Sequence, residues 1–144
     1  MTKKYTDIPL SLLNIEDDGF HVMVQGEING NPANFIIDTG ASRSVFDKDN
    51  ILRFIENPDF ADKDGVSAGV GGCNIDSSTF TISTIKLGEC VIRDYQAIAI
   101  DLKSIHSTYE MLGLPRIDGV LGSDIFVRHK ATINFKMKRL RLFM

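Results

Sequence analysis

The segment best suited to chemistry is an aspartate that directly follows a short apolar run. Residues 35–37 read Phe-Ile-Ile, and Asp38, Thr39 and Gly40 come next. The apolar run predicts a strand that makes Asp38 rigid and half-buried, and the glycine lets a backbone N–H approach the carboxylate. An acid held in this way is suited to activating a water molecule. Taken alone, the tripeptide is more typical of an ordinary turn after a strand than of a catalytic site.

Two further segments strengthen the functional interpretation. Gly69, Val70, Gly71 and Gly72 place three glycines in four residues, which predicts a hairpin tip that can bend and expose its backbone amides. Closer to the C-terminus, an apolar pair stands between glycines and a helix start follows, with Ser123 as the expected cap. That segment contains Val120, Leu121 and Gly122.

The remaining pattern predicts the elements that position these segments. Apolar alternation and turn residues favour several short strands, and Asn29-Gly30 is the strongest signal for a tight hairpin. The expected strands are 8–12, 20–28, 34–37, 79–87, 90–100, 131–135 and 139–143, and the expected helices are 103–112 and a short one, capped by Ser44 or Asp47, that runs through Ile51 to Ile55. Many short strands with glycine turns predict a mostly β chain with two or three short helices and a closed or sandwiched sheet.

Composition limits the function classes. The chain has 144 residues, 43% of them hydrophobic, and a net charge of -3, which predicts one domain spanning residues 1–144 and argues against nucleic-acid binding. The N-terminus has no apolar leader and no stretch reaches membrane-span length, so we expect a cytoplasmic protein without membrane partners. Cys73 and Cys90 lack metal-site or disulfide spacing, and the three histidines are scattered. We therefore expect reduced thiols, no metal and no cofactor.

The three motifs, in this order along the chain, resemble those of the retropepsin-like aspartic proteases, the single-lobed relatives of pepsin. The resemblance covers residues 20–143 and implies a closed acid-protease barrel with a flap hairpin and a homodimeric active site. By resemblance, Asp38 is the catalytic acid, Thr39 locks the two catalytic loops across the dimer, and Gly40 donates an N–H to the carboxylate. Residues 69–72 become the substrate-binding flap, and residues 120–122 cross beneath the Asp-Thr-Gly loop.

The chain holds a single Asp-Thr-Gly, whereas attack of water on a peptide bond needs two carboxylates that share a proton. Asp118 and Asp124 are the rivals for a second acid, but turn and helix-start roles account for both. The resemblance therefore implies a C2 homodimer with one Asp38 from each protomer, acting as an aspartic endopeptidase on peptide or protein substrates.

Several alternatives stay open at this point. The chain is either that protease, a peptide-binding or dimerisation module of the same fold that no longer cleaves, or a monomer that binds a peptide by strand addition. Residues 140–144 either interleave with a partner's strands or complete the chain's own sheet. An insertion at 102–116 favours a cellular or bacterial relative over a viral one. Ala41 offers no hydroxyl donor to the catalytic carboxylates, which predicts an activity optimum at weakly acidic to neutral pH.

Overall fold

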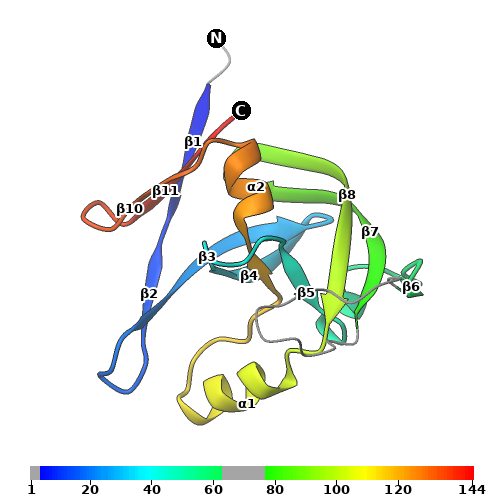
Figure 1. Ribbon diagram of the computed structural model, residues 1–144, viewed down its shortest axis with the longest axis horizontal. Helices are drawn as coiled ribbons and strands as arrows, with labels where there is room; N and C mark the ends of the chain where they lie inside the picture. Colours follow the sequence, from blue (N-terminus) through cyan, green and yellow to red (C-terminus); the bar gives the residue numbers. More distant parts are fainter. Residues whose placement is uncertain (1–3, 63–76) are drawn as a thin grey trace.

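The computed structural model describes residues 4–62 and 77–144. It is mostly β, with two short α-helices and one 3-10 turn in the described residues (Figure 1). In chain order the elements are β1 (Tyr5–Pro9), β2 (Ser11–Asn14), β3 (Phe20–Ile28), β4 (Asn31–Ile37), β5 (Val45–Asp47), η1 (Asn50–Arg53), β6 (Ala61–Asp62), β7 (Ser78–Leu87), β8 (Cys90–Ile100), α1 (Lys103–Met111), β9 (Gly119–Leu121), α2 (Ser123–Arg128), β10 (Thr132–Asn134) and β11 (Arg139–Phe143).

Six strands close into a barrel. The larger sheet has the order β2-β3-β4-β9-β5-β8-β7-β6. An additional pairing joins β3, near one end of this order, to β7, near the other. The closed ring is therefore β3-β4-β9-β5-β8-β7, and its strands pair without an open edge between them. This arrangement confirms the predicted closed, mostly β fold.

The hairpin of β3 and β4 delivers residue 38 to the end of a barrel strand. Asn29 and Gly30 both have positive φ, 50° and 82°, as a two-residue hairpin turn of this hand requires. The turn fixes the register, which places Met23 opposite Ile36. The predicted strand 20–28 is confirmed, and its partner begins three residues earlier than the expected residue 34.

Phenylalanines fill the barrel. The ring of Phe46 makes edge-on contacts with Phe35 and Phe80, with centroids 6.2 and 6.1 Å apart. All three side chains are fully or almost fully buried. The strand β5, which contributes Phe46, therefore anchors the loop that follows Asp38 to the core.

The chain ends lie side by side in a separate three-stranded sheet of order β1-β11-β10 (Figure 1). Leu140 and Leu142 on the central strand are completely buried, while Arg141 points outward and forms a two-point ion pair with Asp7. Of the two alternatives for the C-terminal strand, the structure has the one in which it completes the chain's own sheet.

Three predicted details are wrong. The first expected strand, 8–12, is two strands that belong to different sheets, because the chain changes sheet at Leu10. The expected helix after Ser44 is β5 followed by the single turn η1, and the Asp47 carboxylate accepts the Asn50 N–H that opens this turn. Gly122 rather than Ser123 occupies the N-cap position of α2. In the described part of the chain, no helix is long and apolar enough to cross a membrane.

Candidate active site

Asp38 lies immediately after β4, in a loop that the backbone holds in place. Its N–H donates to the carbonyl oxygen of Leu121 at 2.9 Å, and its own carbonyl accepts the Ala41 N–H at 3.1 Å. The Gly40 N–H donates to Asp38 Oδ1 at 3.0 Å, as expected of that glycine. A carboxylate in this setting keeps one oxygen free of protein donors among the described residues.

The expectation of a half-buried acid is wrong for the single chain, because Asp38, Thr39 and Gly40 are all exposed. In the strand before them Phe35 is buried and Ile36 and Ile37 are half-buried, but the loop itself is exposed. Within the described residues nothing hydrogen-bonds to the Thr39 hydroxyl. Burial of this loop therefore requires contacts beyond those that residues 4–62 and 77–144 of one chain make.

The strand β9 runs beneath the Asp38 loop and fixes the position of this loop relative to the barrel. It pairs in parallel with β4, with Ile37 opposite Leu121. A Cβ built on Gly122 would come within 2.7 Å of the Ala41 carbonyl oxygen and 2.9 Å of Arg43 backbone atoms. Only a glycine allows this approach, so its role here is close packing against the loop.

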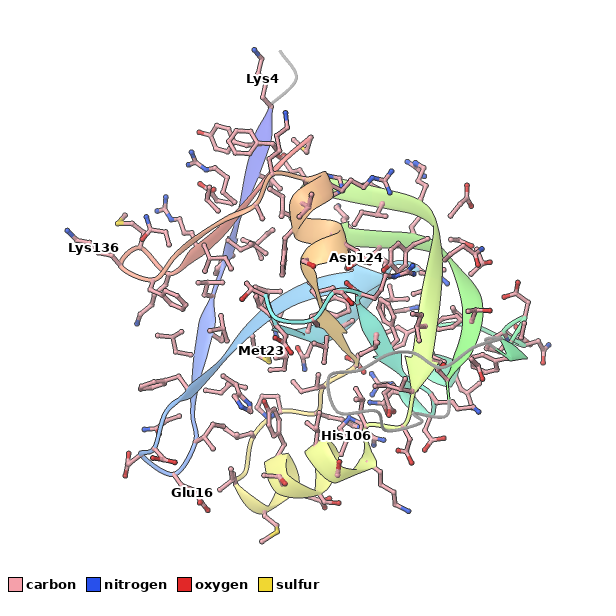
Figure 2. The ribbon with its side chains drawn as sticks, in the orientation of Figure 1. Lys4, Glu16, Met23, His106, Asp124 and Lys136 are labelled. Carbon is pink, nitrogen blue, oxygen red and sulfur yellow. The ribbon has the colours of Figure 1, made fainter. Side chains whose placement is uncertain are left out.

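A polar network that the sequence did not reveal supports the same loop from behind. The Asp124 carboxylate accepts hydrogen bonds from the N–H of Ser44 at 2.9 Å, from its hydroxyl at 2.8 Å, and from the phenol of Tyr95. The Gly122 N–H donates to Ser44 Oγ at 2.9 Å, and Arg43 pairs with Asp124 at 3.6 Å. Figure 2 labels Asp124 at the start of α2. Burial and the neighbouring Asp124 carboxylate raise the pKa of Tyr95 to about 12, so its phenol stays a donor.

A pocket of about 600 Å³ opens beside Asp38, which is one of its lining residues. The ends of β3 and β4 form one side and α1 forms the other. Apolar side chains dominate the lining, with Ile36, Ile37 and Val120 from the strands and Ile105 from the helix. Such a pocket next to an acid is the usual arrangement of a site that binds a substrate side chain.

Asp118 is a structural residue of the site. It is 4% exposed, and its Oδ2 accepts the Asn34 N–H at 2.8 Å, which ties the start of β9 to β4. Its Oδ1 has no partner among the described residues. Burial raises the pKa of this carboxyl, although Arg53, Arg116 and His106 oppose the shift. Asp118 contacts Asn34, four residues before Asp38 on the extended strand β4, so the two carboxylates do not meet at a common water in the single chain.

A cysteine and a histidine that are distant in the sequence meet where β8 begins and α2 ends. Cys90 Sγ lies 3.6 Å from His129 Nδ1, a contact that sequence spacing could not show. The thiol is 2% exposed and burial raises its pKa, against a smaller opposite effect of Arg128. A buried neutral thiol is a poor nucleophile, so this pair offers no rival catalytic centre.

Some predicted residues cannot be compared with the structure. The predicted flap residues Gly69, Val70, Gly71 and Gly72, and Cys73 beside them, lie outside the described residues. Among residues 4–62 and 77–144, no group of three or more metal-binding side chains could hold an ion.

Comparison with known proteins defines the class. A family model described as aspartyl protease matches residues 24–125, which is most of the chain and includes both Asp38 and Gly122. The chain therefore belongs to the aspartyl protease family. A search of curated proteins found no match.

Solved structures with the same fold are retropepsin-like. A retropepsin-like aspartic protease from Rickettsia conorii matches with a TM-score of 0.57 and 16% identity, over 98% of this chain and 96% of that one. EIAV protease in complex with the inhibitor HBY-793 matches with a TM-score of 0.56 and 25% identity, over 78% and 91%. The retroviral protease-like domain of Ddi1 from Leishmania major matches with a TM-score of 0.51 and 19% identity, over 83% and 86%. The chain has the retropepsin-like fold that its motifs predicted.

Proposed function

We propose that this protein is an aspartic endopeptidase that works as a homodimer. The observation that carries the proposal is the Asp38 loop, an exposed carboxylate held by the Gly40 N–H at 3.0 Å beside a mostly apolar pocket. An exposed carboxylate without a catalytic role would not need its loop held in position by hydrogen bonds from β9 and from the Ser44–Asp124 pair. Such support is expected at a catalytic group, whose carboxylate must keep a fixed position relative to the substrate.

The chemistry requires the partner subunit's Asp38. One carboxylate is ionised and takes a proton from water, while the other is protonated and donates to the carbonyl oxygen of the peptide. The resulting hydroxide attacks the carbonyl carbon to give a tetrahedral diol. The C–N bond then breaks, the amine leaves with a proton from one carboxyl, and the other carboxyl recovers the proton of the diol. No redox partner or metal enters this sequence.

The other motif residues take supporting roles in the proposal. Thr39 is exposed and meets the same residue of the partner loop across the two-fold axis, which would complete its hydrogen bonding. Residues 69–72 close over the bound peptide as a flap. Val120, Leu121 and Gly122 form the floor on which the Asp38 loop rests.

The test compares Asp38→Asn with the parent protein and with Asp18→Asn, which removes an exposed carboxylate from the turn between β2 and β3. Cleavage of a proteome-derived peptide library is expected to vanish in Asp38→Asn and to persist in Asp18→Asn. Light scattering should give the same dimer mass for all three proteins. Equal cleavage by Asp38→Asn, or a stable monomer that cleaves, would exclude the proposed mechanism.

A further inference from the structure

The turn between β10 and β11 projects from the body of the molecule and carries two apolar and two basic side chains. Its four residues are Phe135, Lys136, Met137 and Lys138, and all of them are exposed. The exposed fractions of Phe135 and Met137 are 59% and 53%. Figure 1 shows this hairpin extending away from the barrel, and Figure 2 labels Lys136 at its outer end. Apolar side chains that gather on a projecting surface with polar neighbours mark a place of contact with a partner.

Hydrogen bonds give this turn a defined shape. The Met137 N–H donates to Asn134 Oδ1 at 2.9 Å. The Lys138 carbonyl oxygen accepts the Leu10 N–H at 2.9 Å, which ties the turn to the point where the chain changes sheet. Lys138 has φ +53°, a left-handed conformation that returns the chain into β11. Because the backbone of the turn is already fixed, docking would order only its side chains and would cost little conformational entropy.

Positive charge surrounds the turn. Residues 4–10 and 128–144, which hold the terminal sheet, contain seven Lys or Arg residues, whereas Asp7 is their one acidic residue. Asp7 is already engaged by two hydrogen bonds from the Arg141 guanidinium, and Glu89 is a second acid beside β1. The two lysines of the turn form no ion pair with any described residue. The whole chain has a net charge of -3, so this end is basic while the rest is acidic.

A bilayer with anionic headgroups fits this tip better than a protein does. A stable protein interface covers about 800 Å² on each partner, which is more than so short a turn can supply. A headgroup layer needs no complementary shape, and it lets apolar side chains sink in while lysines stay at the level of the lipid phosphates. The alternation of apolar and basic residues along the turn provides both interactions at one place.

We propose that the turn between β10 and β11 docks this protein on an anionic membrane surface. Phe135 and Met137 enter the headgroup layer, and Lys136 and Lys138 pair with lipid phosphates. The inference does not depend on the proposed protease activity, and it replaces the expectation of a protein without membrane partners. Each lysine adds about fivefold to binding close to an anionic surface, so the two together account for about twentyfold.

The experiment measures co-sedimentation of the full chain with vesicles of phosphatidylserine and phosphatidylcholine in equal amounts, and with vesicles of phosphatidylcholine alone. The parent is expected to bind the mixed vesicles, and to bind them more weakly as the salt concentration rises. Lys136→Gln combined with Lys138→Gln should lower this binding about twentyfold. Phe135→Ser combined with Met137→Ser should lower it at high salt as well as at low salt, because the lost contact is apolar.

The matched control combines Lys48→Gln with Lys103→Gln, which removes the same charge from two exposed lysines outside the terminal sheet. It should bind the mixed vesicles as the parent does. Circular dichroism melting establishes that each variant is folded, and the lysine pair keeps the test decisive if the apolar pair does not fold.

Each remaining outcome would overturn the proposal. Equal losses in the control and in the lysine pair would mean that only the net charge of the chain matters. Binding to mixed vesicles that neither turn variant changes would place the contact elsewhere on the chain. A parent that binds neither kind of vesicle would exclude docking on lipid, and if the Phe135→Ser and Met137→Ser variant then also loses the dimer mass in light scattering, the turn contacts a second copy of the chain instead.

Discussion

Gly122→Ala tests whether β9 sets the position of the loop that carries Asp38. The backbone at Gly122 has φ −113° and ψ −172°, which any residue can adopt, so alanine introduces no backbone strain. The free-energy cost of the substitution therefore comes only from steric overlap of the new methyl group with its neighbours. The new methyl group would stand 2.7 Å from the Ala41 carbonyl oxygen and 2.9 Å from two Arg43 backbone atoms, none of which is a flexible side-chain end. The loop that carries Asp38 must therefore move away.

The magnitude follows from overpacking. Forcing one methyl into a filled site costs about 1–3 kcal/mol. For a chain of this size that corresponds to a fall in the melting temperature of about 3–12 °C. The displacement of Asp38 adds a separate loss, since a shift of about 1 Å at a catalytic group reduces activity on the order of a hundredfold. We thus expect a folded protein with very little cleavage.

The assay pairs thermal denaturation with peptide cleavage, and Gly113→Ala is the control. Gly113 has φ +68° and open space around its Cβ position, far along the chain from the loop. Alanine there costs about 1 kcal/mol through backbone strain and leaves cleavage intact. If Gly122→Ala loses stability but keeps full activity, as Gly113→Ala should, the role assigned to β9 is wrong.

Three further predictions concern the surrounding structure. Burial raises the pKa of Asp118 above its usual 3.8, so the folded chain holds that proton more tightly than the unfolded chain, and the free energy of unfolding falls as pH rises through the folded-state pKa. Asp118→Asn lacks this proton, so its stability in urea denaturation, relative to the parent, should increase from acid to neutral pH. A difference in stability that does not depend on pH would contradict this. Burial and Asp124 raise the pKa of Tyr95 to about 12, so the stability linked to its proton should be present below pH 10 and lost as pH rises through about 12. Urea denaturation of the parent and of Tyr95→Phe across this range checks it, and a stability difference that does not change between pH 10 and 12 would refute the network. Leu142→Ala should cost about 2–5 kcal/mol in urea denaturation because the side chain is fully buried, whereas Met144→Ala, 49% exposed, should cost little; equal effects would show that the C-terminal strand is not part of the chain's own sheet.

Local signals predicted most of the fold. Asn29-Gly30 requires positive φ at both residues, and alternating apolar residues fix the long strands, so the two hairpins that form most of the barrel, β3–β4 and β7–β8, were predictable. The change of sheet at Leu10 was not, because one alternating run reads the same whether its partners lie in one sheet or two. The strand β5 was missed because three residues give no usable period.

The candidate site was predictable only in part. Asp38, Gly40 and Gly122 stand in recognisable motifs, and the structure brings them together through the pairing of β4 with β9. The support of the loop by Tyr95 and Asp124 depends on contacts across 29 residues of chain, which no local pattern encodes. The pocket wall on α1 was missed for the same reason. Its helix was expected, but not the face that it presents to Asp38.

The most direct test of the central claim mixes parent and Asp38→Asn protomers at a fixed total concentration, well above the dimer midpoint found by light scattering. If each active site needs one Asp38 from each protomer, an equal mixture contains about a quarter parent homodimers, and cleavage falls to about a quarter of that of the pure parent. Activity that falls only in proportion to the parent fraction, to about a half, would mean that each chain works alone. That result would contradict the shared site.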